Sequence, residues 1–119
     1  MLQKVNNISY LCVRTFDVSA CEANTQIAGI ALPQGAEILH ISVEVKEAGV
    51  SALKADIKIN EEVIGNDIDC ATKGVHFINF VKTLGNNATI DLELNKASNK
   101  GELVLRAHYF LPSQIQVEY

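Results

Sequence analysis

The sequence is poor in several residue types that mark particular protein classes. It has no tryptophan and only two prolines among 119 residues, and ten lysines and arginines stand against 14 acidic residues, for a net charge of −4. Few prolines and an ordinary hydrophobic content argue against a disordered or low-complexity chain. Because no basic block is present, the counterion release that supplies most non-specific affinity for DNA or RNA is missing. We therefore expect a folded protein that does not bind nucleic acid.

The chain also lacks long apolar runs. A membrane-spanning helix needs about 20 consecutive apolar residues, and the longest runs here are only a few residues. The segment Val18-Ser19-Ala20-Cys21 matches the cleavage box of a bacterial lipoprotein signal, but Arg14 and Asp17 interrupt the apolar stretch that such a signal requires. We expect neither a signal peptide nor a membrane partner.

Alternation of apolar and polar residues with period two dominates the chain. Residues 41–46, 53–59 and 90–95 alternate strictly, which is typical of strands with one face on a core and the other in water. Clusters of glycine and asparagine such as Gly65-Asn66-Asp67 mark turns between these runs. The pattern predicts a single all-β domain over residues 1–119, a largely antiparallel sandwich or barrel. The expected strands, about eight in number, span residues 8–18, 25–30, 37–47, 53–60, 75–82, 88–95, 102–110 and 114–118.

Enzyme chemistry has little support in the sequence. The Gly-x-Ser-x-Gly turn of hydrolases and the glycine-rich phosphate loops are absent. Asp91 and Glu93 point to the same side of one strand, as a catalytic pair would, but the alternation makes that side the solvent face. Asn66-Asp67-Ile68-Asp69 resembles part of a calcium loop without its terminal glutamate, and a turn explains it. We predict a protein that is not an enzyme, with no catalytic residue, cofactor or metal.

Histidines and cysteines are the remaining candidates for metal or thiol chemistry. Three histidines on three expected strands could in principle converge on zinc, but nothing in their spacing predicts it. The three cysteines form no Cys-x-x-Cys pair, so we expect reduced and mostly buried thiols. The alternatives are a disulfide between Cys12 and Cys21 and a thiol–base pair of Cys70 with His76. The six residues are His40, His76, His108, Cys12, Cys21 and Cys70.

The C-terminal stretch from Leu103 to Tyr119 holds more apolar and aromatic residues than one edge of a small sandwich readily hides. Such an excess marks an interface when it is exposed. The alternative is that the last strand folds back into the core. The predicted interface residues are Tyr109, Phe110, Leu111, Ile115, Val117 and Tyr119.

Three stretches resemble small virion proteins of bacteriophages and prophages. Residues 35–49 combine a hydrophobic-x-Val-x-Val strand with a small-residue turn, and residues 55–59 form a second alternating strand followed by Gly65. Residues 97–109 add a turn ending in glycine and a valine-containing strand that finishes in an aromatic residue. The resemblance implies a jelly-roll-like β-sandwich that decorates a capsid, forms part of a head fibre or joins a tail assembly.

The same resemblance implies a structural role without catalysis. The protein would associate with itself, as a homo-oligomer such as a trimer, and would bind other virion proteins. It would be found in the virion, or in the bacterial cytoplasm before assembly. A ligand-binding module that adheres to carbohydrate is the alternative function, and it predicts an exposed aromatic or acidic cluster at one loop end.

Overall fold

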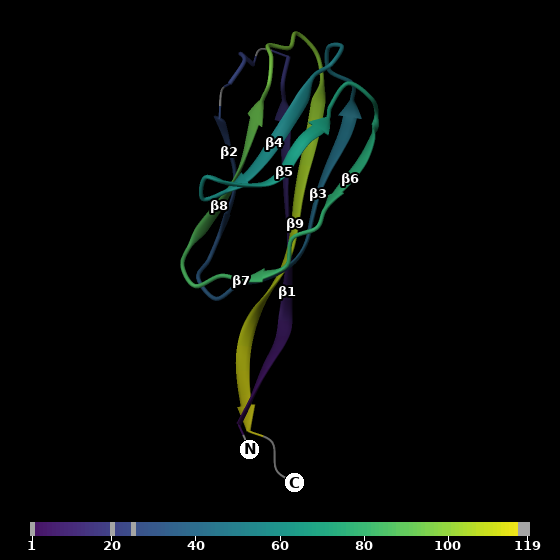
Figure 1. Ribbon diagram of the computed structural model, residues 1–119. Coiled ribbons are helices and arrows are strands. Elements are labelled where there is room, and N and C mark those ends of the chain that lie inside the picture. The colour runs from purple at the N-terminus through teal and green to yellow at the C-terminus, as the bar shows by residue number, and fades with distance from the viewer. Residues whose placement is uncertain (1, 20, 25, 117–119) are drawn as a thin grey trace.

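Nine strands in two antiparallel sheets make up the described part of the chain in the computed structural model (Figure 1). The structure describes the backbone of residues 2–19, 21–24 and 26–116, and the side chains of residues 8–19, 21–24 and 26–111. Among these residues there is no helix with the length and hydropathy needed to cross a bilayer. The strands are β1 (Leu2–Asp17), β2 (Gln26–Leu32), β3 (Glu37–Glu47), β4 (Lys54–Ile59), β5 (Glu62–Asp69), β6 (Gly74–Ile78), β7 (Lys82–Thr83), β8 (Ala88–Leu94) and β9 (Glu102–Gln116).

The order of the strands is that of a jelly roll. The first sheet runs β1-β9-β3-β6, with β7 also pairing with β3, and the second runs β2-β8-β4-β5. Because β6 and β7 both pair with β3, they count as one interrupted strand, which leaves eight. The first of these pairs with the last, the second with the seventh, the third with the sixth and the fourth with the fifth. The predicted jelly-roll-like sandwich is therefore confirmed.

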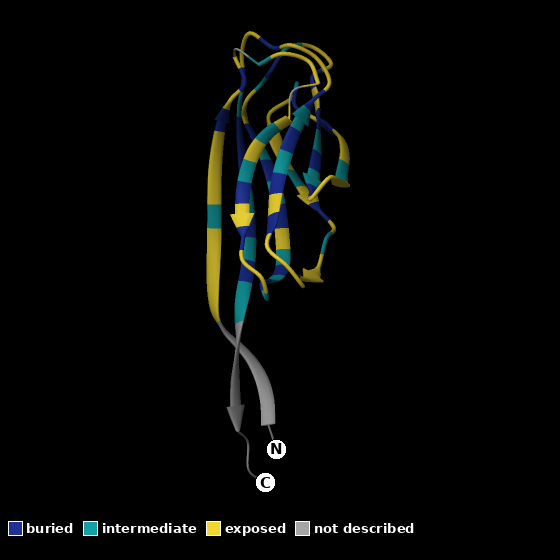
Figure 2. Ribbon diagram, turned by 90° about the vertical axis from the view of Figure 1, so that its left-hand side faces the viewer, coloured by how far each residue is buried: buried dark blue, intermediate teal, exposed yellow. Residues whose placement is uncertain are grey.

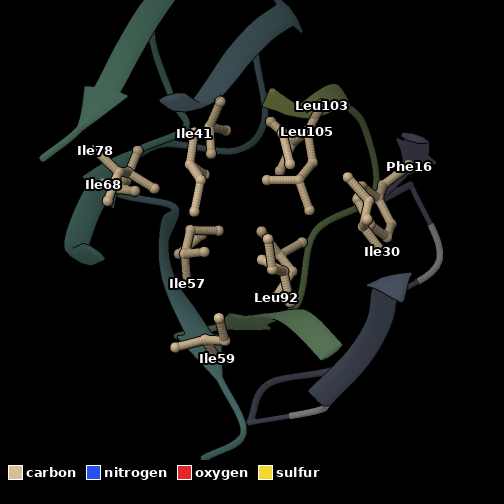
Figure 3. Close-up of a cluster of buried hydrophobic side chains, with 14 of the residues drawn as sticks. Phe16, Ile30, Ile41, Ile57, Ile59, Ile68, Ile78, Leu92, Leu103 and Leu105 are labelled. Carbon is tan, nitrogen blue, oxygen red and sulfur yellow. The ribbon is translucent and has the colours of Figure 1, made fainter. Parts of the chain in front are cut away.

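The hydrophobic core lies between the two sheets. Along β8, from Ala88 to Leu94, buried side chains alternate with partly or fully exposed ones, and buried and exposed bands alternate on other strands in Figure 2. Figure 3 shows Ile41 and Leu105 of the first sheet above Ile57 and Leu92 of the second. Each of these side chains contributes roughly 1.5–3 kcal/mol by leaving water. The period-two pattern read from the sequence thus corresponds to the inner and outer faces of the sheets.

One strand was not predicted. Gly65-Asn66-Asp67 indicated a turn, but these residues lie inside β5. In the pairing with β4, Asn66 and Asp67 stand opposite the single residue Asp56 and form a bulge. Asp67 has a φ of 52°, and its N–H donates a hydrogen bond of 2.9 Å to the carboxylate of Asp56. The turn-forming residues therefore bend a strand here instead of ending it.

The C-terminal stretch forms one long strand, β9, where the sequence predicted two. It pairs antiparallel with β1 from Glu102 to Gln116. Opposite Pro112, which has no N–H to donate to the ladder, β1 carries two residues, Asn6 and Asn7, so that a bulge accommodates the proline. The last strand therefore does not turn back after Phe110.

The ribbon of β1 and β9 extends beyond the sandwich. Both strands are about twice as long as most of the others, and the molecule measures 60 × 24 × 18 Å along its principal axes (Figure 1). We call residues 2–8 of β1 and 111–116 of β9 the arm. Its backbone is paired throughout except at the bulge.

Candidate assembly surfaces

Large apolar side chains are exposed along β1, which is an edge strand of the first sheet. Leu11 is 60% exposed, and Ile8, Tyr10 and Val13 are exposed to a similar degree. Figure 2 shows exposed residues along most of the described part of β1. Single exposed apolar residues are common, but four within six positions of a long edge strand are typical of a surface that another chain covers. We call these four residues the β1 patch.

A second group lies along the opposite edge of the same sheet. Phe77 in β6 is 80% exposed, and Val75 and Val81 are exposed as well. We call these three residues the β6 patch. Phe77 pairs with Ser42 on the outer face, whereas His76 pairs with the buried Val43 and faces inward. The usual order of apolar inside and polar outside is therefore inverted from Val75 to Phe77, whereas Ile78 at the end of β6 is buried in the usual way.

The edge strand β1 carries exposed apolar side chains on both of its faces, since Tyr10 pairs with the inward Tyr109 and Ile8 lies on the same side as Tyr10. Leu11 and Val13 project from the outer face, while Arg14 occupies an inward position opposite the buried Leu105. The guanidinium of Arg14 donates a hydrogen bond of 3.4 Å to the carbonyl of Gly29 in β2 and lies 5.5 Å from the centre of the Phe16 ring. Arg14 can occupy this position because the edge of the sandwich is open to water.

Between the two patches, the outer face is mainly polar. Arg106 and Glu44 form an ion pair at 2.8 Å. The rings of His40 and His108 stack at 5.9 Å, with Phe110 5.2 Å from His108. The topology thus brings His40 and His108, two of the three histidines considered as zinc ligands, together on the outer face. His76 lies on the inward side of β6. Among the described residues, no three metal-ligating side chains come together.

The structure places the predicted C-terminal interface residues in different environments. Tyr109 is only 7% exposed, and its ring stacks on Tyr10 at 5.4 Å, while burial raises the pKa of its phenol. Phe110 and Leu111 are half-buried at the base of the arm, where Leu111 pairs with Ile8 of the β1 patch. The backbone of Ile115 belongs to β9, and its side chain lies outside the described residues, as do Val117 and Tyr119.

The three cysteines are free thiols, so the alternative disulfide is not formed. Cys70 is buried, its thiol donates to the carbonyl of Ile68 at 3.4 Å, and burial raises its pKa to about 12. A thiol held protonated in this way is a poor nucleophile.

The paired carboxylates of β8 lie on the outer face of the second sheet, as the alternation predicted. Glu93 binds Lys58 at 2.7 Å. Asp91 accepts hydrogen bonds from the side chain of Gln26 and from the backbone N–H of Gly29. Both carboxylates therefore connect neighbouring strands.

Two surface recesses are relevant to the alternative function, a ligand-binding module. The larger recess has a volume of about 440 Å³ and lies beside Pro33 and Thr89. The side-chain amides of the two asparagines that line it form hydrogen bonds with the protein backbone. Asn60 binds the backbone N–H of Thr89, and Asn87 accepts a hydrogen bond from the N–H of Gln34 at 2.8 Å. The other recess, about 420 Å³, opens between β5 and β6 and includes Phe77 of the β6 patch in its lining.

Sequence reasoning did not identify either patch. A signal for the first was present in Tyr10-Leu11-Cys12-Val13, a run that is apolar on both faces of one strand. Its meaning depends on β1 being an edge strand, which the sequence does not reveal. The second patch follows from the inverted alternation of β6, which is visible only once the inward side of that strand is known.

The fold is similar to that of chains from phage capsids, and for one of them the sequence is similar as well. Over its full length the chain is 30% identical to one from the acidic stable capsid structure of Helicobacter pylori bacteriophage KHP30, covering all of that chain with a TM-score of 0.76. The capsid of Ralstonia phage GP4 contains a chain with the same fold, at 12% identity, 90% and 86% coverage and a TM-score of 0.64. A chain of the cyanophage Pam1 capsid also shares the fold, at 10% identity, 89% and 86% coverage and a TM-score of 0.62. Neither a protein-family model nor a curated protein matches the chain.

Proposed function

Because the chain belongs to the same family of phage virion structural proteins as the KHP30 capsid chain, we propose that it is built into a phage capsid by associating with itself and by binding other virion proteins. The observation that supports this proposal most strongly is the full-length match to a chain of that capsid. The role is structural and involves no catalysis. The protein resides in the virion, or in the bacterial cytoplasm before assembly.

The arm and its base are the surface that we assign to other virion proteins. Phe110 and Leu111 lie where the ribbon leaves the sandwich, and neither is fully buried within the chain. Leu111 is adjacent to Ile8, whose side chain is exposed. Apolar groups in such a position gain roughly 25 cal/mol for each Å² that a neighbour removes from water. We propose that Ile115, Val117 and Tyr119 continue this interface.

The partners that we propose are proteins. A net charge of −4 without a basic patch gives little attraction to the phosphate backbone, so the chain does not contact the packaged nucleic acid. Self-association produces a closed homo-oligomer, such as a trimer, in which apolar surface of each copy is covered by another.

Co-sedimentation with capsids tests the proposal. Mass spectrometry first establishes whether purified particles contain the chain, and recombinant protein is then added to particles from a deletion strain. We expect the unaltered protein and Ala97→Asp, which alters an exposed loop residue, to bind equally well, and Leu111→Asp to bind at least tenfold more weakly. Absence of the chain from purified particles, or failure of the unaltered protein to sediment with them, would refute the proposal.

A further inference from the structure

We propose that the β1 patch of one copy packs against the β6 patch of a second copy, in a head-to-tail contact that repeats around a closed ring. This inference rests on the proposed self-association and specifies the surfaces that produce it. The β1 patch consists of Ile8, Tyr10, Leu11 and Val13, and the β6 patch of Val75, Phe77 and Val81.

The two patches occupy opposite edges of one sheet. They lie on β1 and along β6, the two outer strands of one sheet, so each copy has one patch on each side. Pairing β1 with β1 of a second copy would leave the β6 patch in water. A contact between unlike patches covers both, and because every copy then uses both sides, the assembly closes into a ring if the rotation allows it.

Val13 and Phe77, one residue from each patch, lie at the same level of the sheet. Val13 of β1 pairs with Arg106, and Arg106 pairs with Ser42. Ser42 in turn pairs with Phe77. Rotation about an axis parallel to the strands preserves height along the strands, so it brings Val13 of one copy level with Phe77 of the next. A ring with this axis therefore brings Val13 of the β1 patch against Phe77 of the β6 patch without displacing either copy along it.

Both patches present apolar surface to a partner copy. The recess between β5 and β6, next to Phe77, has the apolar Ile64 and Ile78 in its wall. On β1, the one charged residue between Ile8 and Phe16 is Arg14, which faces inward and donates a hydrogen bond to the carbonyl of Gly29, so the outer face at Leu11 and Val13 is apolar. The β1 patch therefore offers apolar side chains, and the β6 side offers Phe77 beside a recess of about 420 Å³.

Sedimentation equilibrium of the full chain tests the inference with two charge variants. Leu11→Asp and Phe77→Asp each place an acid in one patch, and we expect each to raise the dissociation constant at least 100-fold and yield monomers. Ala97→Asp adds the same charge on an exposed loop and retains the assembly of the unaltered protein. An equimolar mixture of the two patch variants forms a complex of two chains, because an intact β6 patch on one meets an intact β1 patch on the other.

The controls separate assembly from folding. Both altered side chains are mostly exposed, so melting temperatures measured at a concentration where the unaltered protein is also monomeric should stay within a few degrees of its value. Leu11→Thr and Phe77→Thr retain residues that favour strands and should weaken assembly at least tenfold.

Three results would overturn the inference. Phe77→Asp assembling normally while Leu11→Asp is monomeric would indicate that β1 pairs with itself. Normal assembly of both variants would place the contact elsewhere, and a mixture that remains monomeric would contradict the pairing of unlike patches. In each case the capsid co-sedimentation of the unaltered protein is unaffected, so the proposed function is judged separately. A chain that is monomeric at high micromolar concentration would refute this contact together with the proposed self-association.

Discussion

Replacement of Gly29 by alanine probes a bulge in β2. This strand belongs to the second sheet, and the carbonyl of Gly29 accepts a hydrogen bond from Arg14 of the first sheet. Gly29 is an extra residue in β2, since Ala28 pairs with Asp91 and Ile30 pairs with Ile90. A Cβ atom at this position would lie 2.3 Å from the carbonyl oxygen of Ile90. That oxygen belongs to the backbone of β8, a central strand, so the steric clash is relieved only if β2 and β8 move apart.

The magnitude follows from the size of this overlap. Overpacking in a rigid environment costs about 1–3 kcal/mol, and a backbone contact this short puts Gly29→Ala in the upper half of that range. For a chain of 119 residues the unfolding entropy is roughly 0.25 kcal/mol/K near the melting temperature. We therefore expect the melting temperature to fall by about 8–12 °C. Displacement of β2 would also weaken the hydrogen bond from Arg14 to the carbonyl of Gly29.

Thermal unfolding followed by circular dichroism at equal protein concentration measures this effect. The control is Gly85→Ala, because a Cβ atom at Gly85 meets nothing within 4 Å. That variant should melt at the temperature of the unaltered protein or slightly above it, since alanine restricts the unfolded chain. A melting temperature of Gly29→Ala within about 2 °C of the control would refute the steric account of the bulge.

Three further predictions concern the core, a buried thiol and an ion pair. Leu92→Ala should destabilise the chain by about 2–5 kcal/mol in urea unfolding, because the side chain is fully buried between the sheets. Burial raises the pKa of Cys70 from 9.0 to about 12, so above pH 9 the unfolded state loses this proton first. Stability should then fall by up to about 1.4 kcal/mol per pH unit, and Cys70→Ala should show a smaller fall in alkaline urea titrations. Glu44→Gln should cost no more than about 1 kcal/mol, because the ion pair with Arg106 is partly exposed, and a larger loss in the same assay would contradict this estimate.

The sequence predicts the two-sheet core well because burial on one face imposes a period of two. The buried residues of β4 and β8, and those of β3 from Ile41 to Val45, follow that period, and these strands end within two residues of the prediction. The strand β5 was missed because Gly65-Asn66-Asp67 has the composition of a turn. Only the pairing partner distinguishes a bulge from a reversal, and this partner lies on another strand.

The C-terminal residues show a second limit of prediction. Tyr109 and Phe110 are equally aromatic in the sequence, but one faces the core and the other faces outward from β9. In β6 the alternation would place Val75 and Phe77 inside, whereas the register with β3 places His76 on the inward side. Local pattern therefore predicts that a strand has two faces but does not always predict which face is inside. That choice is set by long-range pairing.

The arm has a consequence for how firmly an assembled ring would hold a surface. In a ring whose axis runs parallel to the strands, all arms project in the same direction, because the rotation that relates the copies preserves the direction of β1 and β9. Once one arm is bound, the others are held near their own sites at a high effective concentration. Individually weak attachments then add to a long residence time, and a ring would detach only when all of its arms were released together.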